Sequence, residues 1–96
     1  MNESEFPVIV CSGTPQPRCV VYGYVDAAPE PGVPVVLRRA RMVLQFGGCG
    51  VFGLAASGPV DGTRMTAAVA EVTDGLVQQW LRVSPEAAVA LDGWAK

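Results

Sequence analysis

The most informative stretch of this sequence is Gly47-Gly48-Cys49-Gly50-Val51-Phe52-Gly53-Leu54-Ala55-Ala56-Ser57-Gly58-Pro59. Its thirteen residues include five glycines and one proline but no charged side chain. Clustered glycine allows a second backbone, or a ligand, to approach the main chain closely. The middle of the stretch, from Val51 to Ala56, is apolar enough for a buried strand. We expect residues 47–50 to form the hairpin turn that precedes it.

Two uses of this glycine-rich stretch are open. Exposed N–H groups could line an anionic ligand, or the absence of side chains could permit tight strand packing at an interface. The pattern Gly48-x-Gly50-x-x-Gly53 has the spacing of a dinucleotide-binding turn, but we expect no helix after it and reject that interpretation. A P-loop is excluded because no Gly-Lys-Ser or Gly-Lys-Thr follows the glycines.

The segments before this stretch are predicted as strands. β-Branched residues favour strands at 6–11 and 19–25, which should pair as a hairpin around the turn residues 12–17. Gly23 indicates a bulge or a closely packed neighbour. Residues 35–46 could form a helix or a strand, and we favour a long strand because prolines precede it and glycines follow it. The intervening segment, 26–34, is rich in proline and is predicted as a loop.

The segments after the stretch end in the clearest local signal of the chain. Ser84 has the properties of a helix N-cap, Pro85 suits the first helical position, and Glu86 complements the helix dipole. This helix should stop at Asp92-Gly93, and Trp94 should dock onto the sheet. Residues 58–70 are predicted to be irregular, and 76–83 a last strand or a helical turn. The predicted fold is therefore α+β and mostly β: an antiparallel meander of about five strands with a short C-terminal helix.

Composition limits the classes of function. The 96 residues are predicted to form a single domain, 1–96. Half of them are hydrophobic and 17% are charged, so we expect the chain to bury apolar surface by forming a homo-oligomer, the alternative being a monomer with an apolar surface. The net charge of −2 argues against binding to a nucleic acid polymer. An acidic start and the lack of a long apolar run predict a cytoplasmic protein without a membrane segment.

Nothing in the sequence indicates catalysis. Histidine is absent, and the three cysteines do not have zinc-ligand spacing, so we expect no metal, no cofactor and no activated thiol. The available carboxylates show no paired spacing that would mark an acid–base couple. We therefore expect a binding protein without enzymatic activity.

Arginine supplies the candidate binding groups. On a regular strand, Arg39 and Arg41 would lie on one face and Arg38 on the other, so that two guanidinium groups could grip a phosphate or carboxylate. The alternative is solvated arginines with an inter-subunit salt bridge. Arg64 could reach the same cavity as Arg41 or pair with Asp61. The candidate ligand-binding residues are Arg41, Arg64, Arg39, Phe52, Gly53 and Gly58, with Phe52 either stacking on a base or packing in a core.

Several segments resemble a small, largely uncharacterised domain family found in phages, prophages and bacteria. The most specific part is the run Gly53-Leu54-Ala55-Ala56-Ser57-Gly58-Pro59, which follows the strand containing Ala40-Arg41-Met42. The sequence departs from the family pattern at Phe46, where the family often has Trp, and at Thr63. The resemblance implies a phage-type setting in the host cytoplasm.

The resemblance and the residues together suggest two functions. In the first, a homo-oligomer holds a small anionic ligand without turnover and sequesters it, and the ligand could be a nucleotide signal of bacterial immunity. In the second, the chain is a structural or protein-interaction module, such as a virion accessory or an inhibitor of a host protein.

Overall fold

The computed structural model describes residues 5–12, 19–30, 32–75 and 77–95. In chain order these residues form the following elements: β1 (Phe6–Ser12), β2 (Cys19–Val25), β3 (Val35–Phe46), α1 (Gly50–Ser57), β4 (Thr63–Met65), β5 (Val69–Asp74), β6 (Val77–Arg82) and α2 (Pro85–Asp92).

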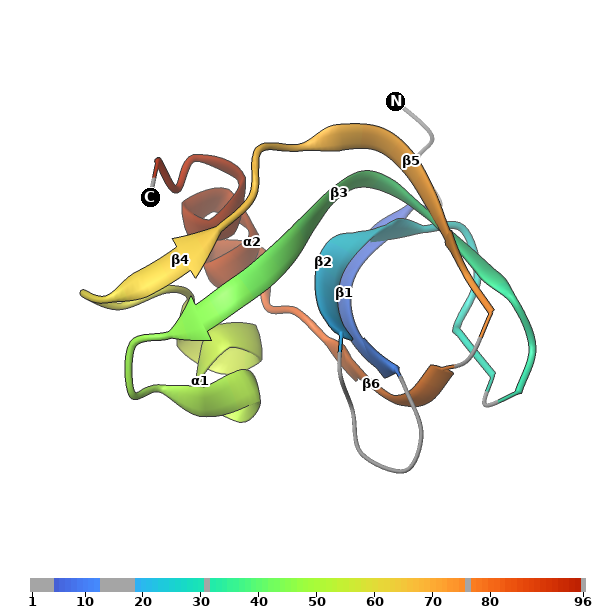
Figure 1. The fold of residues 1–96 in the computed structure, drawn as a ribbon, viewed down its shortest axis with the longest axis horizontal. Coiled ribbons are helices and arrows are strands. Elements are labelled where there is room, and N and C mark those ends of the chain that lie inside the picture. Colours follow the sequence, from blue (N-terminus) through green and yellow to red (C-terminus); the bar gives the residue numbers. More distant parts are fainter. Residues whose placement is uncertain (1–4, 13–18, 31, 76, 96) are drawn as a thin grey trace.

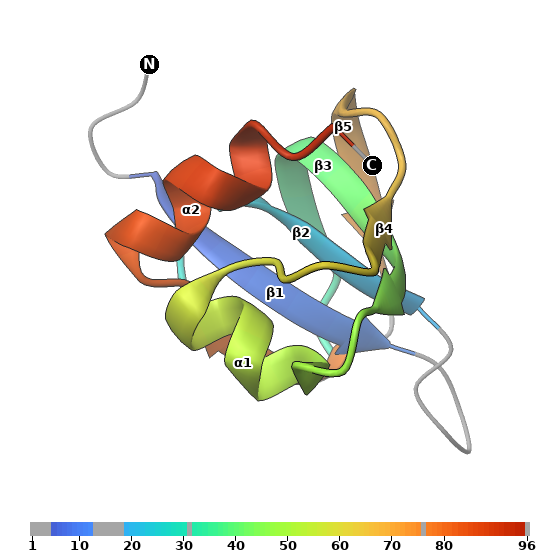
Figure 2. The same cartoon turned by 90° about the vertical axis from the view of Figure 1, so that its left-hand side faces the viewer.

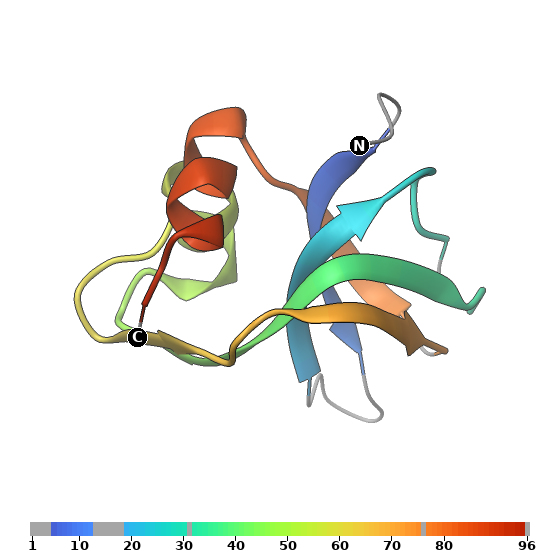
Figure 3. The same cartoon turned by 90° about the horizontal axis from the view of Figure 1, so that it is seen from above.

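A single antiparallel sheet forms the body of the molecule. Its strand order is β4-β3-β2-β1-β6, and β5 also pairs with β3. The long strand β3 pairs with β5 through its first half and with β4 through its second half. The sheet curls strongly, so that β1, β2, β3, β5 and β6 surround a common interior like an open barrel (Figure 1). Both helices lie side by side on the other face of the sheet, outside this interior (Figures 2 and 3).

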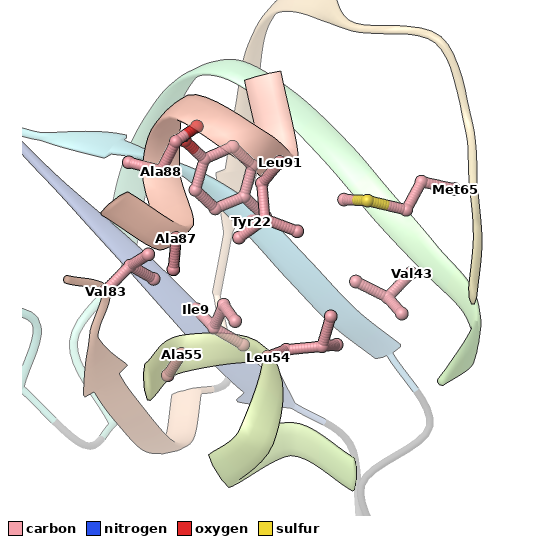
Figure 4. Packing of buried hydrophobic residues seen from close by; sticks show 10 residues of the cluster. All are labelled: Ile9, Tyr22, Val43, Leu54, Ala55, Met65, Val83, Ala87, Ala88 and Leu91. Atoms are coloured by element: carbon pink, nitrogen blue, oxygen red, sulfur yellow. The ribbon is translucent and has the colours of Figure 1, made fainter. Parts of the chain in front are cut away.

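The curled sheet buries residues on both of its faces. Ile9 lies between the sheet and the helices, in a cluster with Tyr22, Leu54 and Leu91 (Figure 4). The neighbouring Val8 and Val10 belong to a second cluster inside the curl. This two-sided burial explains why β1 is a continuous apolar run without polar alternation.

Several predicted elements are confirmed. The strands at β1, β2, β3 and β6 and the C-terminal helix lie where the sequence places them, and β1 and β2 form the expected antiparallel pair. Gly23 marks both a register shift between β2 and β3 and a close approach, because a Cβ there would lie 3.0 Å from the Cβ of Leu37. The proposed turn at 12–17 lies mostly outside the described residues.

The start of α2 also has the predicted capping. The Ser84 hydroxyl accepts a hydrogen bond from the N–H of Ala87 at 3.1 Å and donates one to the carbonyl of Ala56 at 3.0 Å. The backbone N–H of Ser84 donates to Ala55. Ser84 therefore caps one helix and ties it to the end of the other.

The predicted strand from Val51 to Ala56 is wrong, because these residues form helix α1. Consequently, residues 47–50 are not a hairpin turn between strands. Leucine and alanine are strong helix formers, and α1 has Leu54 and Ala55 buried against the sheet. The segment 58–70 is also more regular than predicted, since it contains β4 and the beginning of β5.

Helix α1 follows these glycines, contrary to the expectation that no helix does, so the lack of a helix cannot exclude a dinucleotide-binding turn. The topology still excludes that motif, because it requires parallel strands joined by a crossover helix. Every strand pair in the described part of the sheet is antiparallel.

Candidate functional site

Arg41 is buried, with 7% of the residue exposed, although it carries a charge. Its guanidinium donates three hydrogen bonds to backbone carbonyls: Nε to Thr66 at 2.8 Å, Nη1 to Leu91 at 2.6 Å and Nη2 to Trp94 at 2.6 Å. Leu91 lies in the last turn of α2, where carbonyls lack helical partners and the helix dipole is negative. The arginine thus fastens the end of α2 to β3, and its donors are directed inside the protein.

Two tyrosines reinforce the same end of α2. The hydroxyl of Tyr22 donates to Oδ1 of Asp92 at 2.8 Å, and that of Tyr24 donates to Oδ2 at 2.5 Å. Burial, together with these hydrogen bonds, raises the pKa of Tyr22 far above its ordinary value of 10.0. Burial is also the main reason that the pKa of Tyr24 is raised. The neutral phenols therefore act as structural donors.

Arg39 lies in an irregular part of β3. Its φ of 51° lies in the left-handed region, and its guanidinium lies 4.0 Å from the centre of the Tyr24 ring. Arg39 and Arg38 both pair with Glu5, at 3.5 and 3.2 Å. The predicted separation of these two arginines onto opposite faces is wrong, because the backbone irregularity at Arg39 breaks the strand alternation.

Arg64 lies apart from Arg41. In β4, Thr63 and Met65 are buried toward the helices, so alternation directs the exposed Arg64 to the other face. Among the described residues it makes no hydrogen bond or ion pair, and the proposed pairing with Asp61 is not formed. It borders a hollow of about 590 Å³. The hollow is lined by Gln45, Asp61, Gly62, Thr63, Arg64, Met65 and Ala95.

Phe52 does not line the hollow beside Arg64. It is 70% exposed on α1 and borders a groove of about 450 Å³ between α1 and the end of β6. The other residues of this groove are Ala55, Ala56, Leu81, Arg82, Val83, Ser84 and Pro85. Apart from Arg82 and Ser84, its lining is apolar.

The candidate glycines serve close contacts within the chain. A Cβ on Gly53 would lie 3.0 Å from that of Cys49, and one on Gly58 would lie 3.2 Å from that of Ala90 in α2. Gly58 also has a φ of 94° at the end of α1. The prediction that another backbone approaches this stretch therefore applies within one molecule. Whether a ligand also uses it stays a prediction.

The residues predicted to form one ligand site therefore lie in separate parts of the structure. Sequence reasoning missed Tyr24, Asp92 and Glu5 as polar partners, because their contacts join residues far apart in the chain. Within the described residues, no cluster of three potential metal-ligating side chains occurs. The same part of the chain contains no helix that is long and apolar enough to cross a membrane.

Comparison with known proteins identifies the family of this chain. No curated protein and no solved structure shows significant similarity to the chain. A family model does match, over residues 5–91, and it includes every strand and almost all of α2. The chain therefore belongs to the family described as a domain of unknown function, DUF6948.

Proposed function

We propose that the protein is a non-enzymatic, self-associating binding protein that holds a small anionic ligand at Arg64. The observation that carries this proposal is an exposed guanidinium without a protein partner in the described residues, at the edge of a hollow of about 590 Å³. The amide of Gln45 and the backbone of Gly62 lie in the same hollow and could add neutral donors. Asp61 also lines it and would favour a ligand that carries a donor as well as an anionic group.

Arg64 is a better candidate than Arg41 or Arg39 for this role. All three nitrogens of Arg41 already donate to carbonyls, and Arg39 is engaged by Glu5 and Tyr24. Binding an anion at either residue would require these contacts to break. At Arg64 a phosphate or carboxylate would form a bidentate pair of charge-assisted hydrogen bonds, and no contact of the guanidinium with the described residues would have to break.

Isothermal titration of the full chain with inorganic phosphate and a panel of linear and cyclic nucleotides tests the proposal. At least one anion should bind, and Arg64→Gln should weaken its binding about tenfold or more. Arg82→Gln removes the same charge outside the hollow and should leave the affinity unchanged. A folded protein that gives no heat with any of these anions would overturn the proposal.

The biological setting is part of the same proposal. The resemblance to phage and prophage proteins suggests that the ligand is a signal of host immunity, held without turnover so that its free concentration falls. Recovery of the intact nucleotide after heat denaturation of the complex is the expected outcome. A hydrolysed product in its place would indicate an enzyme.

A protein-interaction module is the second candidate, and the exposure of Phe52 favours it. Aromatic side chains in apolar grooves are frequent anchors of protein interfaces. This function predicts that Phe52→Lys abolishes biological activity while Arg64→Gln preserves it. The anion-binding function predicts the reverse result for Arg64→Gln.

A further inference from the structure

The interior of the curled sheet ends in an apolar hollow of about 280 Å³ between β2, β3 and β5. It adjoins the second core cluster, because Val21 and Ala40 belong to both. Its lining consists of Val21, Ala40, Met42, Thr66, Ala67, Val69 and Val72. None of these side chains carries a charge, in contrast to the hollow beside Arg64.

Two of the apolar side chains around this hollow are left partly in water. Val69 is 49% exposed and Met42 is 38% exposed. Water that fills an apolar hollow has few hydrogen-bond partners, so such spaces bind apolar molecules readily. A ligand here would gain hydrophobic free energy by covering these side chains.

Thr66 supplies one polar group at the hollow. Its hydroxyl oxygen accepts a hydrogen bond from the N–H of Met42 at 2.9 Å. The hydroxyl hydrogen has no acceptor among the described residues, so it is available to donate to a ligand. The lining therefore combines an apolar surface with a single donor.

We propose that this hollow is a second binding site, for a small uncharged molecule with an apolar body and one hydrogen-bond acceptor, such as a medium-chain ketone. The apolar body would lie against Val21, Met42 and Val72, and the acceptor would receive the Thr66 hydroxyl proton. This site is independent of the anion site at Arg64. An acyl carboxylate would bind poorly, because nothing in the lining compensates the loss of its hydration.

Methyl NMR spectra of the full chain during titration with 2-heptanone provide the test. The methyl signals of Val21, Met42, Val69 and Val72 should shift in a saturable manner, while those of Val60 and Val89, which do not line the hollow, stay in place. Heptanoate at the same concentrations should produce no saturable shifts. Equal shifts of all exposed methyl groups, or equal binding of heptanoate, would overturn the proposal.

A matched pair of variants locates the site. Ala67→Phe places a ring in the hollow and should weaken 2-heptanone binding about tenfold or more. Ala68→Phe makes the same change at the adjacent exposed residue, which does not line the hollow, and should bind as the wild type does. Thermal unfolding verifies that both variants fold. Equal affinities in the two variants would contradict the assignment.

The same spectra separate this proposal from self-association. If a second copy of the chain covers the hollow, the Met42 and Val69 signals will change with protein concentration in the absence of ketone, and 2-heptanone will fail to bind. That result would overturn the ketone site and would support the proposed oligomer. Failure of the anion titration would leave the ketone result unaffected.

Discussion

A buried arginine that donates to backbone carbonyls links the sheet to the end of α2. Arg41 donates to the carbonyls of Leu91 and Trp94, and it brings a positive charge to the negative end of the helix. Its position between Ala40 and Met42 in a strand does not reveal this role. The partners of Arg41 are 25, 50 and 53 residues away in the chain, so only the tertiary fold brings them together.

Replacing Arg41 by methionine should therefore destabilise the protein strongly. The side-chain volume is largely kept, but three carbonyls lose charged donors, and we expect the free energy of unfolding to fall by about 3 kcal/mol. Arg64→Met is the matched control, because that exposed arginine has no partner in the described residues, and it should change stability by less than about 0.5 kcal/mol. Urea unfolding followed by circular dichroism measures both. Similar losses in the two variants would contradict the structural role of Arg41.

Tyr22 should control stability in alkaline solution. Its pKa in the folded protein is raised above the ordinary value of 10.0, so the folded chain keeps a proton that the unfolded chain releases. The contribution of Tyr22 is therefore complete below pH 10 and declines as the pH rises above this value. In Tyr22→Phe the fall in stability between about pH 10 and pH 12 should be shallower than in the wild type.

Urea unfolding across this pH range measures the slope. Tyr24→Phe provides a comparison at a phenol whose pKa is also raised but which is only partly buried, and it should flatten the slope less. Tyr22→Phe should also cost about 1 kcal/mol at neutral pH through loss of the hydrogen bond to Asp92. Identical alkaline slopes in wild type and Tyr22→Phe would exclude this role.

At the level of elements, the strands were easier to predict than the glycine-rich stretch. Runs of β-branched residues between turn residues located β1, β2 and β3, and the cap at Ser84 located α2. The stretch from Val51 to Ala56 carries both strand-like and helix-like residues, so local preference could not decide. Tertiary packing decides it, because α1 covers the sheet with Leu54 and Ala55 while Gly58 allows α2 to approach.

Gly47 and Gly48 provide a direct test of why glycine is required before α1. Both have positive φ, but a Cβ on Gly47 would lie 2.6 Å from the carbonyl oxygen of Asp61, whereas one on Gly48 would meet nothing within 4 Å. Gly48→Ala should thus cost about 1 kcal/mol through backbone strain alone. Gly47→Ala adds a clash with the turn before β4 and should cost about 4 kcal/mol.

Chemical unfolding of both variants gives the comparison. Equal costs would show that conformational freedom, and not close approach of the two turns, explains the glycine pair. The larger loss at Gly47 would establish that the β3 end and the turn before β4 are packed backbone against backbone.

For the molecule as a whole, the sequence was informative about the fold class and less so about the site. The antiparallel pairing follows from the order of short strands, while the two-sided core of the curled sheet does not. The density of arginines along the chain predicts a single cluster, yet the burial of Arg41 and the backbone irregularity at Arg39 separate them in space. Grooves and hollows depend on side chains from several elements. The groove beside Phe52 and the hollow between β2, β3 and β5 could therefore not be predicted from short segments of sequence.

The exposed apolar surface of the molecule favours self-association. Several large apolar side chains are exposed, and Phe52 and Val89 are the most exposed of them, at 70% and 76%. Both belong to the helical side of the molecule. Phe52 is beside the groove that contains Leu81 and Val83, so a second copy could bury its own Phe52 there in a two-fold arrangement. We therefore expect the solution mass to exceed that of one chain and to rise with concentration.

Phe52→Lys should shift the association toward the monomer, because lysine would place a charge in an apolar interface. Sedimentation velocity over a range of concentrations should show dissociation constants at least about tenfold weaker than in the wild type. Val60→Lys introduces a lysine at an exposed apolar residue outside the groove and should associate normally. A wild-type chain that stays monomeric at all concentrations would rule out the self-associating part of the proposed function. An oligomer that is unaffected by Phe52→Lys would contradict an interface at Phe52 and would place it on another face of the molecule. The exposed residues Met42, Leu44 and Val69 would then be the next to substitute.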